Sequence, residues 1–459
     1  MLLKKSIIIA SASLLLFLLA CTLQEPKITK TTLSSNEKLL FSRYMALGDN
    51  FISGYQNGAL RVRDQKYSVP ALIARQGETP NFQQPLIANP GIGPESSVGF
   101  GGLELKYLDN PNTPNTINPD PKIYAAPYAD YPNFDMNMVF VSEEVMLYPL
   151  PYSNLAVPGI ITEDVLIGTT KLRSRSHSPM LDVILRNPLP DPYGELSAFE
   201  QAKLFVPSLI TCWVGTFDVL GFARLASSSE TPLPAPTSRE DFSQHYAELM
   251  DSLKNTGAVL VVGNVPDILD MPYFNLVPPV VIDTLLNAPY LDNGNTVALV
   301  GVQEGDKIVT QAKFKMKEGY GIPKGILNGN GEPLPDNMVL DSDEISMIRT
   351  AITDYNEVID SVCTARGIPV VDMHTFFKQM QEGIQVAGTT ITDDFISGGF
   401  YSLDGIHPSS LGNALIANEW IEVINSTFRL SIPAVNVVEI MEKVQPHVLA
   451  ADTSYVNMN

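Results

Sequence analysis

The chain has 459 residues, of which 45% are hydrophobic and 17% are charged, and this composition suits a globular protein and excludes a wholly disordered one. Its 50 acidic and 30 basic residues give a formal net charge of -20. Nucleic acids and anionic lipid headgroups are bound through clustered Lys and Arg, so this charge balance argues against both as partners. The length permits two or three domains, or one domain with long insertions.

The N-terminus has the features of a targeting segment. Lys4 and Lys5 precede a largely apolar stretch, residues 6–17, which is shorter than the roughly 20 residues that a membrane-spanning helix needs. The Leu-Leu-Ala-Cys sequence that ends at Cys21 resembles the bacterial lipoprotein box, which implies cleavage before Cys21 and acylation of that residue. The alternative is an ordinary signal peptide followed by an unrelated cysteine.

This resemblance implies a location as well as a modification. We expect a signal peptide over residues 1–20 and a lipidated Cys21 with a polar tether over residues 21–41. Lipid chains on Cys21 would anchor the protein at the bacterial outer membrane, on its periplasmic or cell-surface face, without a spanning helix.

Few residues could hold a metal. Cys212 and Cys363 each lie among apolar neighbours and are predicted to be buried, reduced thiols, although a disulfide between them is compatible with export. The five histidines are scattered without the spacing of metal ligands. We therefore expect neither a metal nor another cofactor.

Apolar runs that end in turn residues predict the strands of a buried sheet. The first strand is predicted at 44–47, and the nearly continuous apolar run at 207–215 is typical of a central strand covered on both faces. Further strands are predicted at 153–159, 258–263 and 368–373.

Helices are predicted between the later strands. Ser238 can cap a helix that Gly257 ends, and its apolar residues recur at helical spacing: Phe242, Tyr246, Leu249 and Leu253. Two more helices are predicted at 343–365 and 409–428. The alternation of strand and helix is typical of a parallel sheet.

We therefore expect an α/β fold, a three-layer α/β/α sandwich with a parallel sheet of about five strands. One domain would span residues 42–430, with insertions at about 80–151 and 264–340, and residues 431–459 would form a C-terminal tail. The insertion at 264–340 is expected to form a small lid or subdomain, with a hairpin around residues 292–300.

The turn after the first strand, Gly48-Asp49-Asn50, is a candidate site. In an α/β sheet such a turn lies at the ligand-binding edge, and a strand-to-turn position of this kind commonly carries a nucleophile. The residue presented here is Asn50, whose amide is not a nucleophile.

Asp404 and His407 form a second candidate, three residues apart in a loop before the last predicted helix. A carboxylate that fixes the imidazole tautomer, with the imidazole free to accept a proton, is what activation of a hydroxyl requires. By itself this spacing is weak evidence, because a structural role is the more common explanation of such a pair.

Four short blocks taken together resemble the SGNH or GDSL-type esterases and lipases, in the version found in lipoproteins of Bacteroidetes-type bacteria. In order they are Gly48-Asp49-Asn50 against Gly-Asp-Ser, Gly159 against the second-block glycine, Gly215-Thr216-Phe217-Asp218 against Gly-x-Asn-Asp, and Asp404-Gly405-Ile406-His407-Pro408 against Asp-x-x-His-Pro. The resemblance implies a sheet with flavodoxin-like strand order.

The resemblance also implies residue roles. His407 matches the catalytic base, Asp404 the acid that orients it, and Gly159 one donor to the oxyanion. Asn50 replaces the nucleophilic serine and Phe217 replaces the oxyanion asparagine. Loss of one oxyanion donor costs about 10²–10³ in rate, and loss of a nucleophile costs on the order of 10⁶.

The sequence offers two ways in which activity could persist without the nucleophilic serine. Ser53 could stand in as nucleophile, but it lies three residues onward, and a misplacement of about 1 Å can already cost 10²-fold. Water activated directly by His407 is the other route. The Phe217 ring would either make the site more apolar or pack against Trp213 or the neighbouring turn.

The sequence therefore predicts an outer-membrane lipoprotein with a degenerate esterase centre. Its expected role is to bind a lipid or glycan at the old site, or to serve as an accessory subunit beside an outer-membrane protein partner. The alternative is an active hydrolase of acyl or acetyl esters that uses His407 and Asp404 with an atypical nucleophile.

Overall fold

The computed structural model describes residues 32–93, 102–106, 124–127, 139–186, 195–224, 233–277, 280–282, 296–326 and 329–444. The chain divides into a short unit, Met1–Ser34, and a large unit, Ser35–Asn459, which contains the main sheet and its helices. The predicted signal peptide, Cys21 and most of the tether lie outside the described residues. None of the helices in the described ranges has the length and apolar character required to cross a membrane.

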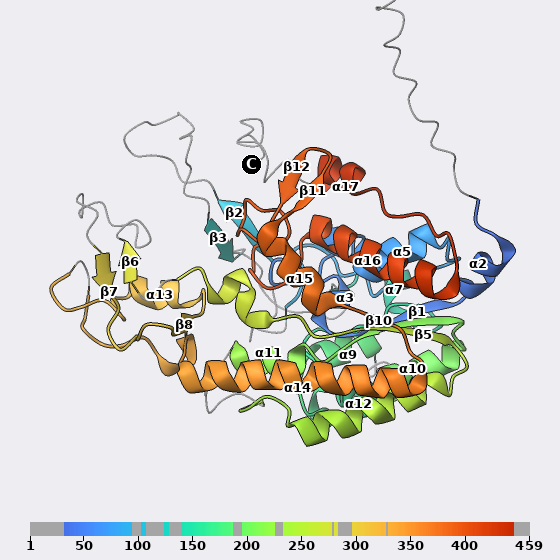
Figure 1. The fold of residues 1–459 in the computed structure, drawn as a ribbon, viewed down its shortest axis with the longest axis horizontal. Coiled ribbons are helices and arrows are strands. Elements are labelled where there is room, and N and C mark those ends of the chain that lie inside the picture. Colours follow the sequence, from blue (N-terminus) through green and yellow to red (C-terminus); the bar gives the residue numbers. More distant parts are fainter. Residues whose placement is uncertain are drawn as a thin grey trace, which may run out of the picture. The chain divides into compact units, whose positions relative to one another are not determined.

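Four parallel strands form the central sheet, in the order β1 (Tyr44–Gly48), β4 (Leu209–Trp213), β5 (Val259–Gly263) and β10 (Val370–Val371). Every residue of β1 and β4 is buried, as the apolar runs predicted for strands covered on both faces. The predicted parallel α/β sheet is therefore confirmed (Figure 1).

The fifth predicted strand is reduced to an isolated parallel bridge between Asn154 and Ala46 of β1. The Ala46 N–H donates to Ser153 O at 2.8 Å, and Leu155 N–H donates to Ala46 O at 2.9 Å. Val157 N–H also donates to Gly48 O at 2.9 Å, so the segment follows β1 as far as its last residue. The segment still lies along the free edge of β1, so the chain-order pattern is 2-1-3-4-5, as in flavodoxin-like sheets.

Helices cover both faces of the sheet, and Figure 1 shows α12 and α14 on one side and α5 and α16 on the other. Ser238 caps α12 (Arg239–Lys254) through a hydrogen bond from Asp241 N–H. Asp341 and Glu344 form a capping box at the start of α14 (Ser342–Arg366), which Gly367 ends in a left-handed conformation.

On the opposite face, α16 (Ser410–Phe428) packs against α5 (Val69–Gln76) and contacts β10. The predicted C-terminal tail contains a helix, α17 (Val437–Val444), which packs on α16. The remaining α-helices are α2 (Ser35–Leu40), α3 (Asn50–Ser53), α4 (Val62–Gln65), α7 (Glu143–Met146), α8 (Asp164–Ile167), α9 (Met180–Leu185), α10 (Ala198–Phe205), α11 (Phe217–Ala223), α13 (Ala312–Lys317) and α15 (Met373–Glu382).

Short antiparallel pairs lie outside the main sheet. They are β2 (Leu103–Lys106) with β3 (Tyr124–Pro127), β6 (Val280–Ile282) with β7 (Thr296–Ala298), β8 (Lys307–Ile308) with β9 (Val339–Leu340), and β11 (Ile384–Val386) with β12 (Thr389–Ile391). Short 3₁₀ helices occur at Lys171–Arg173, Ile268–Asp270, Pro272–Phe274 and Asp336–Met338.

The segment at about 264–340 has a small apolar cluster of its own, which lies between short strands and α13: Val277, Leu299, Ile308, Ala312, Met316, Ile322 and Leu334. Strands β6 and β7 are antiparallel, and the predicted turn at residues 292–295 between them lies outside the described residues. In the earlier insertion, at about 80–151, much of the chain also lies outside the described ranges.

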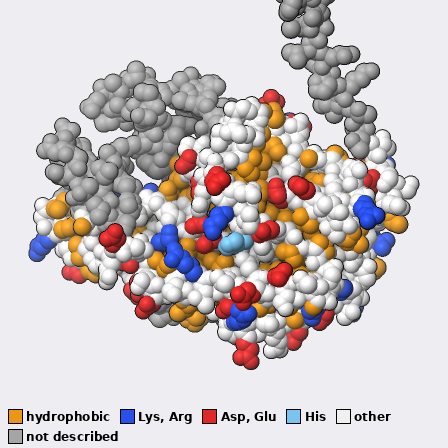
Figure 2. All heavy atoms as spheres, in the orientation of Figure 1, with side chains coloured by type: hydrophobic (Ala, Val, Ile, Leu, Met, Phe, Trp, Pro, Cys, Tyr) orange, Lys and Arg blue, Asp and Glu red, His pale blue; other side chains and the backbone are white. Residues whose placement is uncertain are grey.

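The two described cysteines, Cys212 and Cys363, are free and buried, which confirms the prediction of reduced thiols. On the surface, acidic and basic side chains are interspersed with hydrophobic ones across the face shown in Figure 2.

Candidate active site

The site is built on the turn that follows β1. Asp49 caps α3 by accepting a hydrogen bond from Phe51 N–H at 3.1 Å, so Asn50 becomes the first residue of this short helix. Gly48 allows the turn to lie against β4, because a Cβ at this position would come within 2.3 Å of Trp213 O. Asn50 therefore sits at the carboxyl end of β1, with only 1% of its surface exposed.

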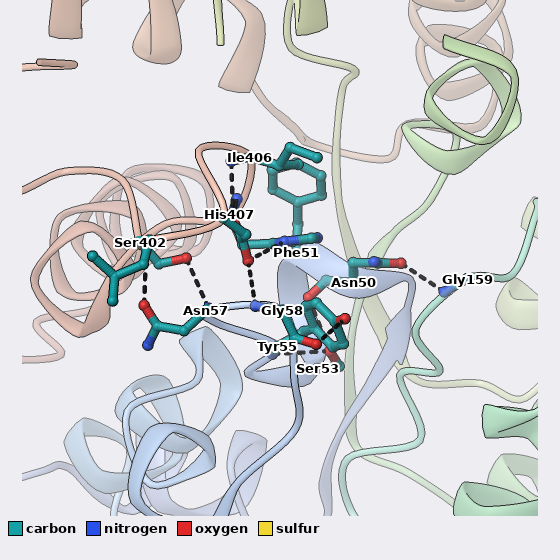
Figure 3. A network of polar contacts seen from close by, with 12 residues as sticks. Asn50, Phe51, Ser53, Tyr55, Asn57, Gly58, Gly159, Ser402, Ile406 and His407 are labelled. Carbon is teal, nitrogen blue, oxygen red and sulfur yellow. Dashed lines mark hydrogen bonds and ion pairs between the residues drawn. The ribbon is translucent and has the colours of Figure 1, made fainter. Parts of the chain in front are cut away.

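The amide of Asn50 is bound by the predicted oxyanion glycine. Gly159 N–H donates to Asn50 Oδ1 at 2.6 Å, and Figure 3 shows this contact beside α3. Gly159 has a φ of 83°, a left-handed conformation that glycine adopts without strain and that aims its N–H at the site. The predicted oxyanion donor is thus in place, but the side chain that replaced the nucleophile occupies it.

Asp404 and His407 are held together by a dense set of hydrogen bonds. His407 Nδ1 lies 3.0 Å from Asp404 Oδ2, which also accepts from Gly58 N–H at 2.9 Å. Asp404 Oδ1 accepts from the N–H groups of Ile406 and His407 at 2.9 and 2.8 Å. The predicted dyad is therefore formed, with the carboxylate fixed by three backbone donors.

The charge of Asp404 follows from these contacts. Burial alone would raise the pKa of Asp404, but the charge interaction with His407 and the hydrogen bonds from His407 and Ile406 lower this pKa to about 2. The ionised carboxylate accepts a hydrogen bond from His407 Nδ1–H, so in the neutral imidazole the lone pair lies on Nε2.

The imidazole of His407 packs beside α3. Its ring centre lies 5.3 Å from that of Phe51 and 4.7 Å from that of Tyr55, which meets it edge-on. Figure 3 shows the imidazole extending toward Asn50. The fold thus brings together residues from the two ends of the domain, as expected from the carboxyl edge of a parallel sheet.

Phe217, the predicted oxyanion position, is the first residue of α11. Its N–H donates to Asp49 Oδ2 at 3.4 Å. Its ring lies over Gly221, one turn further along the same helix, where a Cβ would come within 3.1 Å of the ring. Of the two interpretations of this ring, packing against its own neighbouring turn is the one that the contacts support.

Ser53 is engaged locally. Its hydroxyl donates to Asn50 O at 2.9 Å and accepts from Tyr55 N–H at 3.2 Å, which ends α3. Both bonds hold it within its own turn, so the geometry gives no support to Ser53 as a nucleophile.

Two buried carboxylates at the site were not predicted as site residues. Burial raises the pKa of Asp49 to about 7 and that of Asp218 to about 6, although backbone hydrogen bonds oppose both shifts. Asp218 Oδ2 accepts from the N–H and the hydroxyl of Thr162, both at 2.8 Å. Both could have been predicted from the sequence, since Asp49 and Asp218 are each the aspartate of a matched block. They brace the turns that carry Asn50 and Phe217.

With this geometry established, a family model described as GDSL-like Lipase/Acylhydrolase matches residues 44–420. The chain belongs to this family. The matched range includes Asn50, Gly159, Phe217, Asp404 and His407. The SGNH/GDSL-type resemblance seen in the four blocks is therefore confirmed.

Other comparisons add little to this assignment. Among solved structures, the chain is similar to the crystal structure of the lipase/acylhydrolase from Enterococcus faecalis, at 11% identity over 64% of this chain and 90% of that chain, with a TM-score of 0.26. A score this low supports no detailed structural inference. A search of curated proteins gives no match.

The matched range holds all four blocks of the predicted resemblance, with Asp404, His407 and Gly159 at positions that agree with its pattern and Asn50 and Phe217 at positions that differ from it. Among the described residues, no group of three or more His, Cys, Asp or Glu side chains is arranged to hold a metal ion.

Proposed function

We propose that this GDSL-family protein does not hydrolyse esters and instead binds a lipid or glycan at the substituted catalytic site, or acts there as an accessory subunit of an outer-membrane complex. The observation that carries the proposal is the 2.6 Å hydrogen bond from Gly159 N–H to Asn50 Oδ1. A substrate carbonyl cannot use this donor while the Asn50 amide holds it.

Two independent losses support inactivity. Asn50 offers His407 no hydroxyl to activate, and loss of a triad nucleophile costs on the order of 10⁶ in rate. Phe217 supplies no amide to a tetrahedral intermediate, a loss that by itself costs about 10²–10³ in rate. The combined losses leave only the residual catalysis of a binding site.

A lipid anchor on Cys21 completes the proposal. The protein would be held at the outer membrane by acyl chains, with residues 21–41 as the tether. Metabolic labelling with an alkyne analogue of palmitate tests this, since label should be incorporated into the wild type and lost in Cys21→Ser. Equal labelling of both would reject the anchor.

A second candidate is an active hydrolase of acyl or acetyl esters with an atypical nucleophile. The observation that favours it is the retained dyad, in which an ionised Asp404 holds His407 Nδ1 at 3.0 Å. A dyad of this geometry can still polarise a water molecule.

Hydrolysis of p-nitrophenyl acetate and butyrate separates the two candidates. We expect the wild type and His407→Ala to be equally inactive. The double variant Asn50→Ser with Phe217→Asn should gain turnover, and adding His407→Ala to it should remove that gain. Turnover by the wild type that His407→Ala abolishes would establish the hydrolase instead.

A further inference from the structure

Two buried polar atoms at the site have no hydrogen-bond partner among the described residues: Asn50 Nδ2 and His407 Nε2. Both residues are 1% exposed. A buried donor or acceptor left unpaired costs about 1–3 kcal/mol, so such atoms in folded proteins are normally satisfied. In the view of Figure 3 the imidazole of His407 extends toward Asn50.

The hydrogen-bonding character of each atom is fixed by its neighbours. Gly159 N–H at 2.6 Å requires the oxygen of the Asn50 amide, so the NH₂ group faces the other way and can only donate. With its proton on Nδ1, where it is donated to Asp404 Oδ2 at 3.0 Å, the neutral imidazole of His407 presents Nε2 as an acceptor. The pair therefore presents one donor and one acceptor.

We propose that a neutral hydroxyl group binds between Asn50 Nδ2 and His407 Nε2, accepting from the first and donating to the second. This inference rests on the proposed function, since it names the ligand chemistry of the same site. A hydroxyl is the smallest group that accepts and donates through one atom. A carbonyl, an ether or an ionised acid has no proton to give to Nε2.

The hydroxyl has two sources, a bound water and an alcohol group of a ligand such as a glycan or a lipid headgroup. The surroundings suit a carbon-bearing ligand, because the rings of Phe51 and Tyr55 pack on His407 at 5.3 and 4.7 Å between ring centres. Apolar rings next to a few oriented polar atoms are typical of small-molecule sites.

A crystal structure of the wild-type chain, with and without a 1-hexanol soak, tests the assignment. We expect an oxygen at hydrogen-bond distance from both Asn50 Nδ2 and His407 Nε2. Alkyl density on that oxygen only in the soaked crystal assigns it to a ligand alcohol, and an unchanged isolated oxygen assigns it to water. Direct contact between the two side chains, or no bridging oxygen, would overturn the inference.

A matched pair of probes tests it in solution without any variant. By saturation-transfer NMR, 1-hexanol should bind at least about 10-fold more tightly than 1-methoxypentane, which has the same number of heavy atoms and no O–H. Absence of binding by both, with a bridging oxygen in the crystal, assigns the hydroxyl to water. Equal, saturable binding of both would contradict the proposed hydrogen bonds.

The variant Asn50→Asp keeps the acceptor for Gly159 N–H and replaces the Nδ2 donor with a second acceptor. A single alcohol proton cannot serve two acceptors, so the preference for 1-hexanol over the ether should fall by about 10-fold. The charge control is Asn330→Asp, at an exposed position, which should keep the wild-type preference. An unchanged preference in Asn50→Asp would argue against Nδ2 as the donor.

These results are separable from the proposed function. Ester turnover by the wild type would reject inactivity while a bridging oxygen still supports the hydroxyl site. An inactive wild type without a bridging oxygen would reject only the hydroxyl site.

Discussion

Asp404→Asn is the substitution that most directly probes how His407 is held. The carboxylate receives four hydrogen bonds, two on each oxygen, from Gly58 N–H, Ile406 N–H, His407 N–H and His407 Nδ1. An amide has a single acceptor oxygen, so one pair of donors must face its NH₂ group. We expect the variant to fold with a less stable site and an altered His407 tautomer.

The loss of folding stability in Asp404→Asn can be worked out in two ways. Two buried donors left without an acceptor cost about 1–3 kcal/mol each, which gives roughly 2–4 kcal/mol after partial relaxation. Independently, a pKa lowered from 3.8 to about 2 corresponds to roughly 2–3 kcal/mol of stabilisation by the ionised form. The side chain is 11% exposed, so solvent screening reduces this value little.

Urea unfolding followed by circular dichroism measures the effect, with Asp360→Asn as the control. Asp360 is exposed, so its variant should remain within about 0.5 kcal/mol of the wild type. Equal unfolding midpoints for Asp404→Asn and Asp360→Asn at pH 7 would refute the role given to the carboxylate.

The stabilisation of the folded state by Asp404 should depend on pH in one direction. The folded pKa lies below the unfolded one, so the stabilisation by Asp404 is complete above about pH 4 and is lost as the pH falls toward 2. The stability difference between the wild type and Asp404→Asn should therefore narrow over that window. A difference that stays constant from pH 7 to pH 2 would show that charge contributes nothing.

Further predictions concern the scaffold. Gly48→Ala should destabilise the protein by at least about 3 kcal/mol, because its Cβ would lie 2.3 Å from Trp213 O, whereas Gly257→Ala, with nothing within 4 Å, should cost only about 1–2 kcal/mol for its left-handed φ; similar thermal midpoints for both would contradict the clash. Burial raises the pKa of the Asp49 carboxyl to about 7, so the folded state retains a proton that the unfolded state loses. The contribution of Asp49 to the free energy of unfolding should therefore fall as the pH rises from about 4 through 7. Urea midpoints that increase over this range equally in the wild type and in Asp49→Asn would contradict this prediction. Arg186→Lys should lower stability by about 2–3 kcal/mol, since the buried guanidinium donates to backbone carbonyls at 2.7 and 2.9 Å and a lysine cannot reproduce that fork; an unchanged melting temperature would show that the fork is dispensable.

The order of strands and helices could be predicted because it is encoded locally. Apolar runs such as 207–215, the helical spacing after Ser238 and the stop at Gly367 each depend on residues that are close in sequence. The four blocks were readable for the same reason, and they pointed to Asn50 and His407 before any contact was known.

At the edge of the sheet, the local sequence pattern was not sufficient to predict how much of a strand would form. Residues 153–159 have the composition of a strand, yet only one bridge to β1 forms, although Leu155 N–H and Val157 N–H both donate to β1 carbonyls at 2.9 Å. The extent of this pairing depends on the register against β1, which the composition of the segment does not contain.

The sequence by itself determined which residues stand in the four GDSL-type blocks, with Asn50 at the predicted nucleophile position and Phe217 at the predicted oxyanion position, since residue identity alone carries that information. Only the tertiary structure decided that the Asn50 amide occupies Gly159 N–H and that Asn50 Nδ2 and His407 Nε2 are buried without a hydrogen-bond partner among the described residues. Those facts depend on the distance and orientation of groups more than 100 residues apart, which the packing of the sheet and its turns sets and which no local pattern contains.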